Sequence, residues 1–198
     1  MTERIVLTHV YQIREAFDGS IQPTKRGLMQ VCAIWELARQ ERIDGVLVAG
    51  GKVWGEQYPV FSEVLARQMR QIGVDIPIFI FSDAMDTPQE INTYLKEAKK
   101  REWKKLVFVG NETHLERIKN RVKARGIKEA NFISSEEVLT QMPYFHQFVE
   151  EFKQSQIEAN FKRREARVRL AYKLGLEKTL TLVARMGRKR PFKVNFDE

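Results

Sequence analysis

Apolar residues gather in five short runs that alternate with longer amphipathic segments. The runs occupy residues 4–8, 45–49, 77–81, 105–109 and 131–133. Each is rich in β-branched or aromatic residues, and the middle three are apolar almost throughout, which is typical of parallel strands buried on both faces. The pattern therefore predicts five strands of a mostly parallel sheet.

Between these runs the apolar residues recur at helical spacing. We expect helices at about residues 24–41, 60–72, 87–101 and 113–125, and Gly73 and Gly126 stand where two of them should end. Strands that alternate with helices of this length form right-handed βαβ units. The predicted fold class is α/β, a three-layer Rossmann-like parallel sheet of about five strands with a C-terminal helical appendage.

The pattern changes after Pro143. Aromatic and aliphatic side chains recur there at helical spacing, at Tyr144, Phe145, Phe148, Val149, Phe152, Ile157 and Phe161. We predict a Rossmann-like domain at 1–142, a helical appendage at 143–187 that packs this stripe on the sheet domain, and a basic tail at 188–198. A second interpretation of the stripe is an oligomer interface through Phe145, Phe148 and Phe152.

Positive charge is concentrated at the C-terminal end of the chain. The formal net charge is +8, and residues 151–198 hold 13 lysines and arginines against 6 acidic residues, a net of +7. The first 150 residues are thus nearly neutral. The basic residues between 162 and 193 support an alternative function, binding of nucleic acid or an anionic surface, although no recognised nucleic-acid motif is present.

Cysteine content and hydropathy favour a cytoplasmic location. The single cysteine, Cys32, cannot form an intramolecular disulfide and fits a reducing compartment. No apolar run approaches the ~20 residues that span a bilayer, and the N-terminus lacks a signal-peptide pattern. We therefore expect a protein without a transmembrane segment.

Polar residues follow four of the predicted strands. They are His9 after the first, Gly50, Gly51 and Lys52 after the second, Asp83 and Thr87 after the third, and Asn111, His114 and Arg117 after the fourth. In an open parallel sheet, ligands bind beyond the carboxyl ends of the strands, near the point where strand order reverses. With the common order 3-2-1-4-5, His9 and His114 should lie on opposite sides of one crevice.

These residues suit an anionic ligand better than a metal. The Gly50-Gly51 pair permits a tight turn with free N–H groups that would face an anion, the alternative being a purely structural turn. His114 and Arg117 lie one helical turn apart near a helix start and could hold a phosphate or carboxylate; the alternative is a cap and a solvent-facing arginine. The three histidines and one cysteine lack metal-ligand spacing, so we predict no metal site.

Taken together and in order, these positions resemble the YdcF/SanA/ElyC family, a bacterial domain of largely unknown function. The matching residues are Arg26, Gly50-Gly51, Ser62-Glu63, Met69, Gly73-Val74, Asp86-Thr87 and His114-Leu-Glu-Arg117, and the match covers about residues 4–140. The chain differs from the family pattern in having Thr8-His9-Val10 after the first strand, Phe81-Ser82 at the end of the third, and Glu90 where an Asn is common.

The resemblance implies a Rossmann-like domain, with S-adenosylmethionine binding suggested for cytoplasmic relatives and envelope polysaccharide roles for membrane-anchored ones. Our leading hypothesis is a YdcF-like protein that binds a nucleotide-like or phosphorylated ligand, with S-adenosylmethionine a candidate. Gly50 and Gly51 would donate backbone N–H groups, and Glu63 and Asp83 would bind ribose hydroxyls or an ammonium group. Thr87, His114 and Arg117 would hold the anionic part, with His114 a candidate general acid or base. The sequence leaves open whether a reaction is catalysed.

Overall fold

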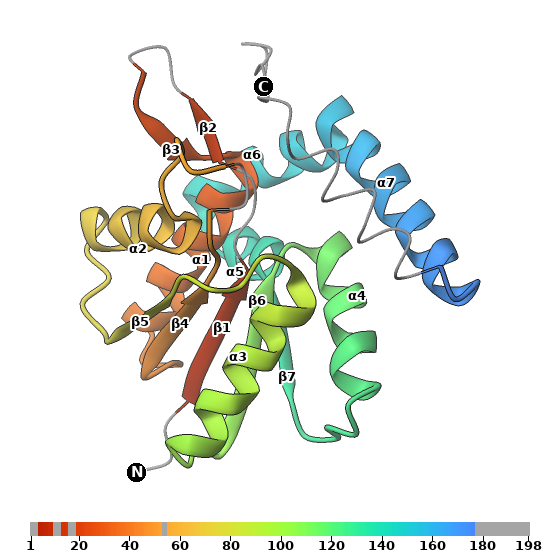
Figure 1. Ribbon diagram of the computed structural model, residues 1–198. Helices are drawn as coiled ribbons and strands as arrows, with labels where there is room; N and C mark the ends of the chain where they lie inside the picture. The colour runs from red at the N-terminus through yellow and green to blue at the C-terminus, as the bar shows by residue number, and fades with distance from the viewer. Residues whose placement is uncertain (1–3, 10–12, 16–18, 53–54, 177–198) are drawn as a thin grey trace.

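A five-stranded parallel sheet forms the centre of the computed structural model, which describes residues 4–9, 13–15, 19–52 and 55–176 (Figure 1). Its strands are β1 (Arg4–His9), β4 (Gly45–Ala49), β5 (Ile78–Phe81), β6 (Lys105–Gly110) and β7 (Asn131–Ser134). Their order is β5-β4-β1-β6-β7, and every neighbouring pair is parallel. The predicted fold class and strand order are confirmed, and strand order reverses between β1 and β6.

Seven helices are described along the chain. They are α1 (Lys25–Arg39), α2 (Phe61–Gln71), α3 (Thr87–Lys100), α4 (Glu112–Lys123), α5 (Ser135–Thr140), α6 (Pro143–Gln154) and α7 (Gln156–Lys173). The first four lie within two residues of the predicted bounds. Gly73 and Gly126 follow α2 and α4 with φ of 87° and 76°, the left-handed conformation in which glycine commonly ends a helix.

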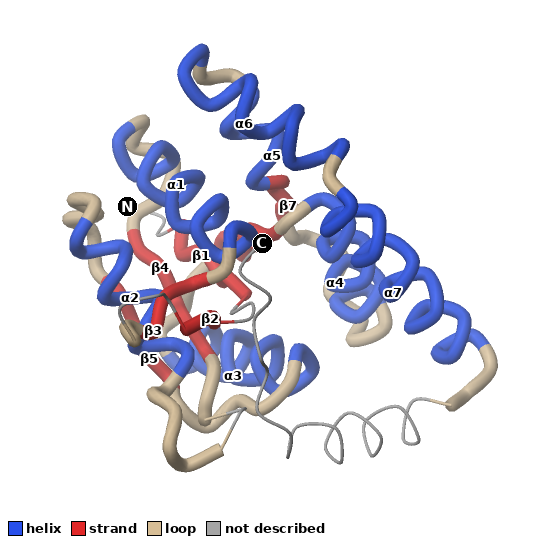
Figure 2. The backbone as a smooth tube through the Cα atoms, turned by 90° about the horizontal axis from the view of Figure 1, so that it is seen from above, coloured by secondary structure: helices blue, strands red, loops and turns tan. Residues whose placement is uncertain are grey.

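Helices cover both faces of the sheet (Figure 2). Side chains along β1 alternate between two core clusters, one on each face of the sheet. Val6 packs in a cluster with α1, α2, α5 and α6, whereas Ile5 and Leu7 pack in a second cluster with α3 and α4. Successive strand residues point to opposite faces, so a near-continuous apolar strand requires helices on both sides. The result is the three-layer arrangement that the apolar runs predict.

Tyr94 fixes α3 against the central strands. Its buried hydroxyl donates to the carbonyl of Ile5 in β1 and accepts from the N–H of Val107 in β6, 3.0 Å away. Glu90 lies one helical turn before Tyr94 and therefore shares its face of α3. The tyrosine thus directs Glu90 toward the carboxyl end of β1.

Several features of the fold, helix α5 among them, are not anticipated by the sequence pattern. A short antiparallel pair, β2 (Ile13–Glu15) and β3 (Ile21–Pro23), precedes α1. The appendage divides into α6 and α7 at Ser155, whose extended backbone ends α6 and whose Oγ accepts from the N–H of Glu158. Ser155 is therefore the N-terminal cap of α7.

The aromatic stripe of the appendage is only partly buried. Val149 and Phe152 of α6 belong to the core cluster that contains Val6, whereas the side chains of Tyr144 and Phe148 are exposed by 65% and 39%. The end of the predicted appendage and the whole basic tail, residues 177–198, lie outside the described residues. Among the described helices, none combines the length and apolarity needed to cross a membrane.

Candidate functional site

Charged and polar side chains converge where strand order reverses, between the carboxyl ends of β1 and β6. We call this group the switch-point cluster; it consists of His9, Arg26, Glu90, His114, Arg117, Glu158 and Glu165. The rings of His9 and His114 meet edge to face, with centroids 5.5 Å apart. The strand order thus brings these two histidines together at the reversal point, in direct contact rather than on opposite sides of a crevice. Both are buried.

His9, the last residue of β1, is held by a carboxylate from α3. Its Nδ1 lies 2.5 Å from Oε2 of Glu90, and both residues are buried. A carboxylate only accepts hydrogen bonds, so the proton of this bond is on Nδ1. The Nε2 atom of His9 is buried and makes no hydrogen bond. Glu90 therefore fixes the orientation of the ring and leaves the other nitrogen without a hydrogen-bond partner.

His114 is buried one turn into α4 and is electrically neutral. Arg117 donates from Nη2 to Nδ1 of His114 over 2.8 Å, which places a lone pair on that nitrogen. Burial lowers the pKa of His114 well below its usual range, and the nearby charges of Arg117, His9, Arg26 and Arg121 lower that pKa further. The candidate general acid or base of this site thus carries no charge near neutral pH.

Helix α7 lies across this end of the sheet, beside α4 (Figures 1 and 2). Its Glu158 pairs with Nη2 of Arg26 from α1 and accepts from the hydroxyl of Thr113 over 2.7 Å. The Arg26 guanidinium also lies over the ring of Phe161, 3.2 Å from its centroid. These contacts bury Arg26 and Glu158 together, so α7 and the start of α1 form one packed unit.

Glu165 is the second α7 carboxylate in the switch-point cluster. Its Oε2 lies 2.9 Å from Nε of Arg117, and its Oε1 lies 3.5 Å from Nδ1 of His114. The Arg117–Glu165 pair lacks hydrogen-bond geometry, since neither Nε nor Oε2 has a hydrogen-bond partner. Burial raises the pKa of Glu165, although Arg117 and other arginines oppose that shift. The charges of Arg117 and Glu165 are opposite and close, but no hydrogen bond joins Nε of Arg117 to Oε2 of Glu165.

The charges of the cluster come from different parts of the fold. The sheet domain supplies Arg26, Arg117 and two histidines, and its own acid, Glu90, already serves His9. The carboxylates that neutralise the two arginines come from α7. The buried Arg26 requires such a partner, because an unpaired buried charge is very unfavourable, and the half-buried Arg117 benefits from one for the same reason. Without α7, this end of the sheet would present a cationic site for an anion.

The glycine pair after β4 has a structural role. The N–H of Gly50 donates to the carbonyl of Phe81 over 2.8 Å, and that of Gly51 donates to the carbonyl of Ala84 over 2.7 Å. A Cβ on Gly51 would lie 2.4 Å from the carbonyl oxygen of Ser82. The expectation of free amide donors is therefore wrong, because Gly50 binds the last residue of β5 and Gly51 binds the loop that follows it. Glycine is required at position 51 for close packing.

Other predicted residues lie apart from the switch-point cluster. Lys52 pairs with Glu56 over 2.9 Å, Glu63 and Asp83 are exposed, and Thr87 begins α3 in a half-buried position. Within the described part of the chain, no hydrogen bond or ion pair joins Lys52, Glu63, Asp83 or Thr87 to the cluster. Their assignment to ribose hydroxyls, an ammonium group or an anion stays a prediction.

Two buried amides beside the cluster retain polar atoms without partners. Asn111 donates from Nδ2 to Ser135 and Glu136, over 3.0 and 3.1 Å, while its Oδ1 makes no hydrogen bond. Gln30 of α1 accepts from the hydroxyl of Thr8 over 2.9 Å, while its Nε2 is unpaired. Most buried polar groups in proteins are satisfied, so such atoms indicate a place where a ligand or water completes the site.

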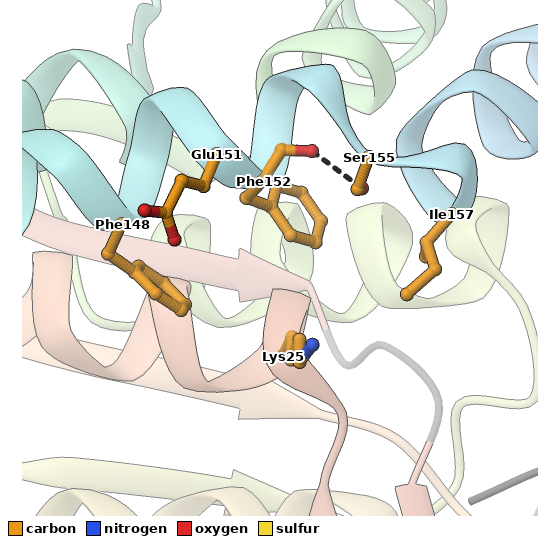
Figure 3. Close-up of a pocket in the computed structure, with 6 residues that line it drawn as sticks. All are labelled: Lys25, Phe148, Glu151, Phe152, Ser155 and Ile157. Atoms are coloured by element: carbon orange, nitrogen blue, oxygen red, sulfur yellow. Dashed lines mark hydrogen bonds between the residues drawn. The ribbon is translucent and has the colours of Figure 1, made fainter. Parts of the chain in front are cut away.

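A cavity of about 120 Å³ lies near the cluster but is separate from it. Figure 3 shows Phe148, Phe152 and Ile157 pointing from α6 and α7 toward Lys25 of α1, with Glu151 at one side. It contains none of the predicted site residues. Its lining is mostly apolar, so we assign it to the packing of α6 and α7 on α1 and not to ligand binding.

Several residues of the cluster are absent from the sequence prediction. Arg26 appears there only as part of the family resemblance, and Glu90 only as a difference from it. Glu158 and Glu165 lie in the predicted helical appendage, where the prediction named the apolar stripe and the basic residues but no acid, although their separation by seven residues places them on one face. Among the described residues, no group of three or more histidines, cysteines or acids has an arrangement that could hold a metal ion.

Comparison with protein families, curated proteins and solved structures finds no match to this chain. The resemblance to the YdcF/SanA/ElyC family therefore stays a prediction.

Proposed function

We propose that this chain is a YdcF-like small-molecule-binding protein whose ligand is phosphorylated or nucleotide-like and places its anionic group in the switch-point cluster. The observation that carries this proposal is that Arg26 and Arg117 are neutralised by carboxylates supplied from α7. Arginine binds phosphate and carboxylate oxygens with the same forked geometry. A ligand phosphate can therefore replace Glu165 at Arg117.

The position of the cluster supports the same proposal. It lies at the reversal point of an open parallel sheet, where ligands of such folds bind. His114 and Arg117 lie in the first two turns of α4, where the helix dipole favours negative charge. Buried atoms without partners on His9, Gln30 and Asn111 provide further donors and acceptors for a polar ligand.

The cluster favours a phosphorylated ligand over S-adenosylmethionine. S-adenosylmethionine carries one carboxylate beside a sulfonium and an ammonium cation. The buried Arg26, the half-buried Arg117 and their cationic neighbour Arg121 would repel those cations. A phosphate group carries more negative charge and more acceptor oxygens. S-adenosylmethionine remains in the ligand panel as the candidate that the family resemblance suggests.

A binding experiment tests the proposal directly. Inorganic phosphate, pyrophosphate, nucleotides, sugar phosphates and S-adenosylmethionine are added singly, and ligands that raise the melting temperature are measured by calorimetry. Arg117→Ala should weaken anion binding about ten- to hundredfold, because it removes a charge-assisted contact. Arg117→Lys should recover part of that loss, since it keeps the charge without the fork.

Arg70→Ala is the matched control, because Arg70 is exposed at the end of α2, away from the cluster. Circular dichroism establishes that each variant is folded at the temperature of the titration. Equal affinity in wild type, Arg117→Ala and Arg70→Ala would show that the anion binds elsewhere. Absence of any anion binding by the wild type would overturn the proposal.

A second candidate function has one observation in its favour. The solvent-exposed surface of α7 carries Lys162, Arg163, Arg164 and Arg167. We propose as the alternative that this basic face binds nucleic acid or another polyanion through phosphate contacts. It is compatible with ligand binding in the cluster, because the basic side chains are exposed whereas the acids that α7 gives to the cluster are buried.

A further inference from the structure

The Glu90–His9 pair has a feature that anion binding alone does not require. His9 is fully buried at the end of β1, and Glu90 accepts its Nδ1 proton over 2.5 Å. In the neutral ring the lone pair is then on Nε2, and that atom has no hydrogen-bond partner. A carboxylate that fixes one nitrogen of an imidazole and leaves the other available is the arrangement by which enzymes prepare a reactive histidine.

The surroundings of His9 suit attack on phosphorus. The ring of His114 lies edge to face with His9, 5.5 Å between centroids. Arg117 donates to Nδ1 of His114 over 2.8 Å. The guanidinium cation of Arg117 therefore lies next to His114, on which the ring of His9 packs. Guanidinium groups close to a transferring phosphoryl group stabilise the charge on its oxygens.

We propose that His9 is the nucleophile of a phosphoryl-transfer reaction, accepting a phosphoryl group on Nε2 from the phosphorylated ligand of the switch-point cluster, with Glu90 as its positioning residue. This inference rests on the proposed function, since it uses the same anion site. It adds that the site breaks a phosphate ester or phosphoramidate bond rather than only binding it.

The reaction has two steps. The Nε2 lone pair of His9 forms a bond to phosphorus, and the bond from phosphorus to the leaving group breaks with its electron pair on the leaving atom. A water molecule then attacks the phosphorus of phosphohistidine. The N–P bond breaks, its electrons return to Nε2, and the proton of the water goes to solvent or the departing phosphate. Glu90 keeps the proton on Nδ1 throughout, so Nε2 is the free nitrogen after each cycle.

The full chain is tested with two phosphoryl donors, p-nitrophenyl phosphate and phosphoramidate. Nitrophenolate leaves without needing a proton, and so does ammonia from phosphoramidate, whose nitrogen is already protonated. Samples are quenched in base, because phosphohistidine is labile to acid, and are analysed by intact-mass and fragment mass spectrometry. We expect one phosphoryl group, placed on His9. In a Glu165→Gln background, where the internal anion is removed, labelling should be faster.

Two variants separate chemistry from structure. His9→Asn keeps an N–H that can donate to Glu90 but has no counterpart of Nε2, so it should bind phosphate and show no labelling. Glu90→Gln no longer fixes the tautomer and should slow labelling at least about tenfold. His146→Asn, at an exposed histidine of α6, should label like the wild type.

The outcomes distinguish this inference from the proposed function. Phosphate binding by calorimetry without labelling of His9 would overturn the nucleophile and leave the binding site intact. Labelling spread equally over His9, His114 and His146, or nitrophenol release with no phosphohistidine, would also overturn it. If the wild type binds no phosphate and is not labelled, both proposals fail.

Discussion

At the scale of single residues, the ionisable groups of the switch-point cluster make stability depend on pH. The pKa of His114 is well below its usual range because of burial and the nearby Arg117. The unfolded chain therefore takes up a proton near pH 6.5 that the folded chain does not. This contribution to stability is complete above about pH 6.5 and is lost as the pH falls toward the folded pKa.

We predict that replacing His114 with Gln makes stability less dependent on pH. Between about pH 7.5 and 5, the wild type should lose up to ~1.4 kcal/mol per pH unit below 6.5 because of this group. Glu165, with its raised pKa, acts in the opposite direction, since its stabilising contribution is lost as the pH rises above about 4.5. Urea unfolding at several pH values measures the difference between the two proteins.

The exposed His146 provides the control, because His146→Gln should leave the pH dependence of unfolding unchanged. Parallel pH dependences for wild type and His114→Gln would show that His114 titrates in the folded protein as it does in water.

Gly51 gives the second prediction at this scale. Gly51→Ala places a Cβ 2.4 Å from the backbone oxygen of Ser82, and backbone cannot move aside as a flexible side chain can. We expect a loss of stability of about 1–3 kcal/mol, the usual cost of overpacking. Lys96→Ala, at an exposed position of α3, should change stability by less than about 0.5 kcal/mol in the same unfolding experiment. Equal stability of the two variants would contradict the clash.

The sequence supplies part of the candidate site at this scale. His9, His114 and Arg117 follow from one topological rule, which brings the ends of the first and fourth predicted strands together. Glu90 does not follow from it, because its role depends on how α3 turns on the sheet, a matter settled by Tyr94. The glycine pair misleads because a turn with free amides and one with satisfied amides have the same sequence.

At the scale of elements, α7 covers the candidate site and supplies the carboxylates that pair with its two arginines. Two buried carboxylates and the Phe161 ring join it to α1 and α4. The strong periodicity of the first four helices makes them predictable. In α7 the sequence indicates only an apolar stripe and a basic run, and neither predicts which residues bind the sheet domain. Its docking comes from Glu158 and Glu165, two residues whose partners are remote in sequence.

We predict that Glu165→Gln raises the affinity for phosphate. The wild-type carboxylate competes with the ligand for Arg117, and an amide of nearly the same shape competes much less. An increase of at least about tenfold is expected, the effect of one hydrogen bond to a charged group. The fold should tolerate the change, because burial already raises the pKa of Glu165 and so disfavours its charged form. Calorimetric titration with inorganic phosphate provides the measurement.

Glu150→Gln is the control for that comparison, since Glu150 forms a surface pair with Lys153 on α6. It should leave phosphate affinity unchanged. If Glu165→Gln binds phosphate no better than Glu150→Gln, the α7 carboxylate does not occupy the site of the ligand anion.

At the scale of the whole molecule, charge is separated across a single helix. Helix α7 contributes two buried acids to the switch-point cluster, and its outer, solvent-exposed surface carries Lys162, Arg163, Arg164 and Arg167. The near-neutral sheet domain and the strongly positive C-terminal part thus meet at α7. Composition alone predicts the excess of positive charge after residue 150, but it cannot predict that acids of the same segment turn inward.

The outer face of α7 yields the last prediction, on binding of a polyanion. The triple variant Lys162→Gln, Arg163→Gln and Arg167→Gln should weaken binding of single-stranded RNA at low salt. It makes fewer phosphate contacts, so fewer counterions are released from the RNA on binding. The slope of log affinity against log salt should fall in magnitude by about two, given ~0.7 for each contact to a single strand. Arg164 is left in place, since its charge acts on the pKa of Glu165.

The control changes Lys96, Lys99 and Lys100 of α3 to Gln, which removes the same charge from another exposed helix face. Fluorescence anisotropy at several salt concentrations gives both slopes. Equal losses in the two triple variants would mean that RNA responds only to net charge, and no loss in the α7 variant would exclude its outer face from the contact.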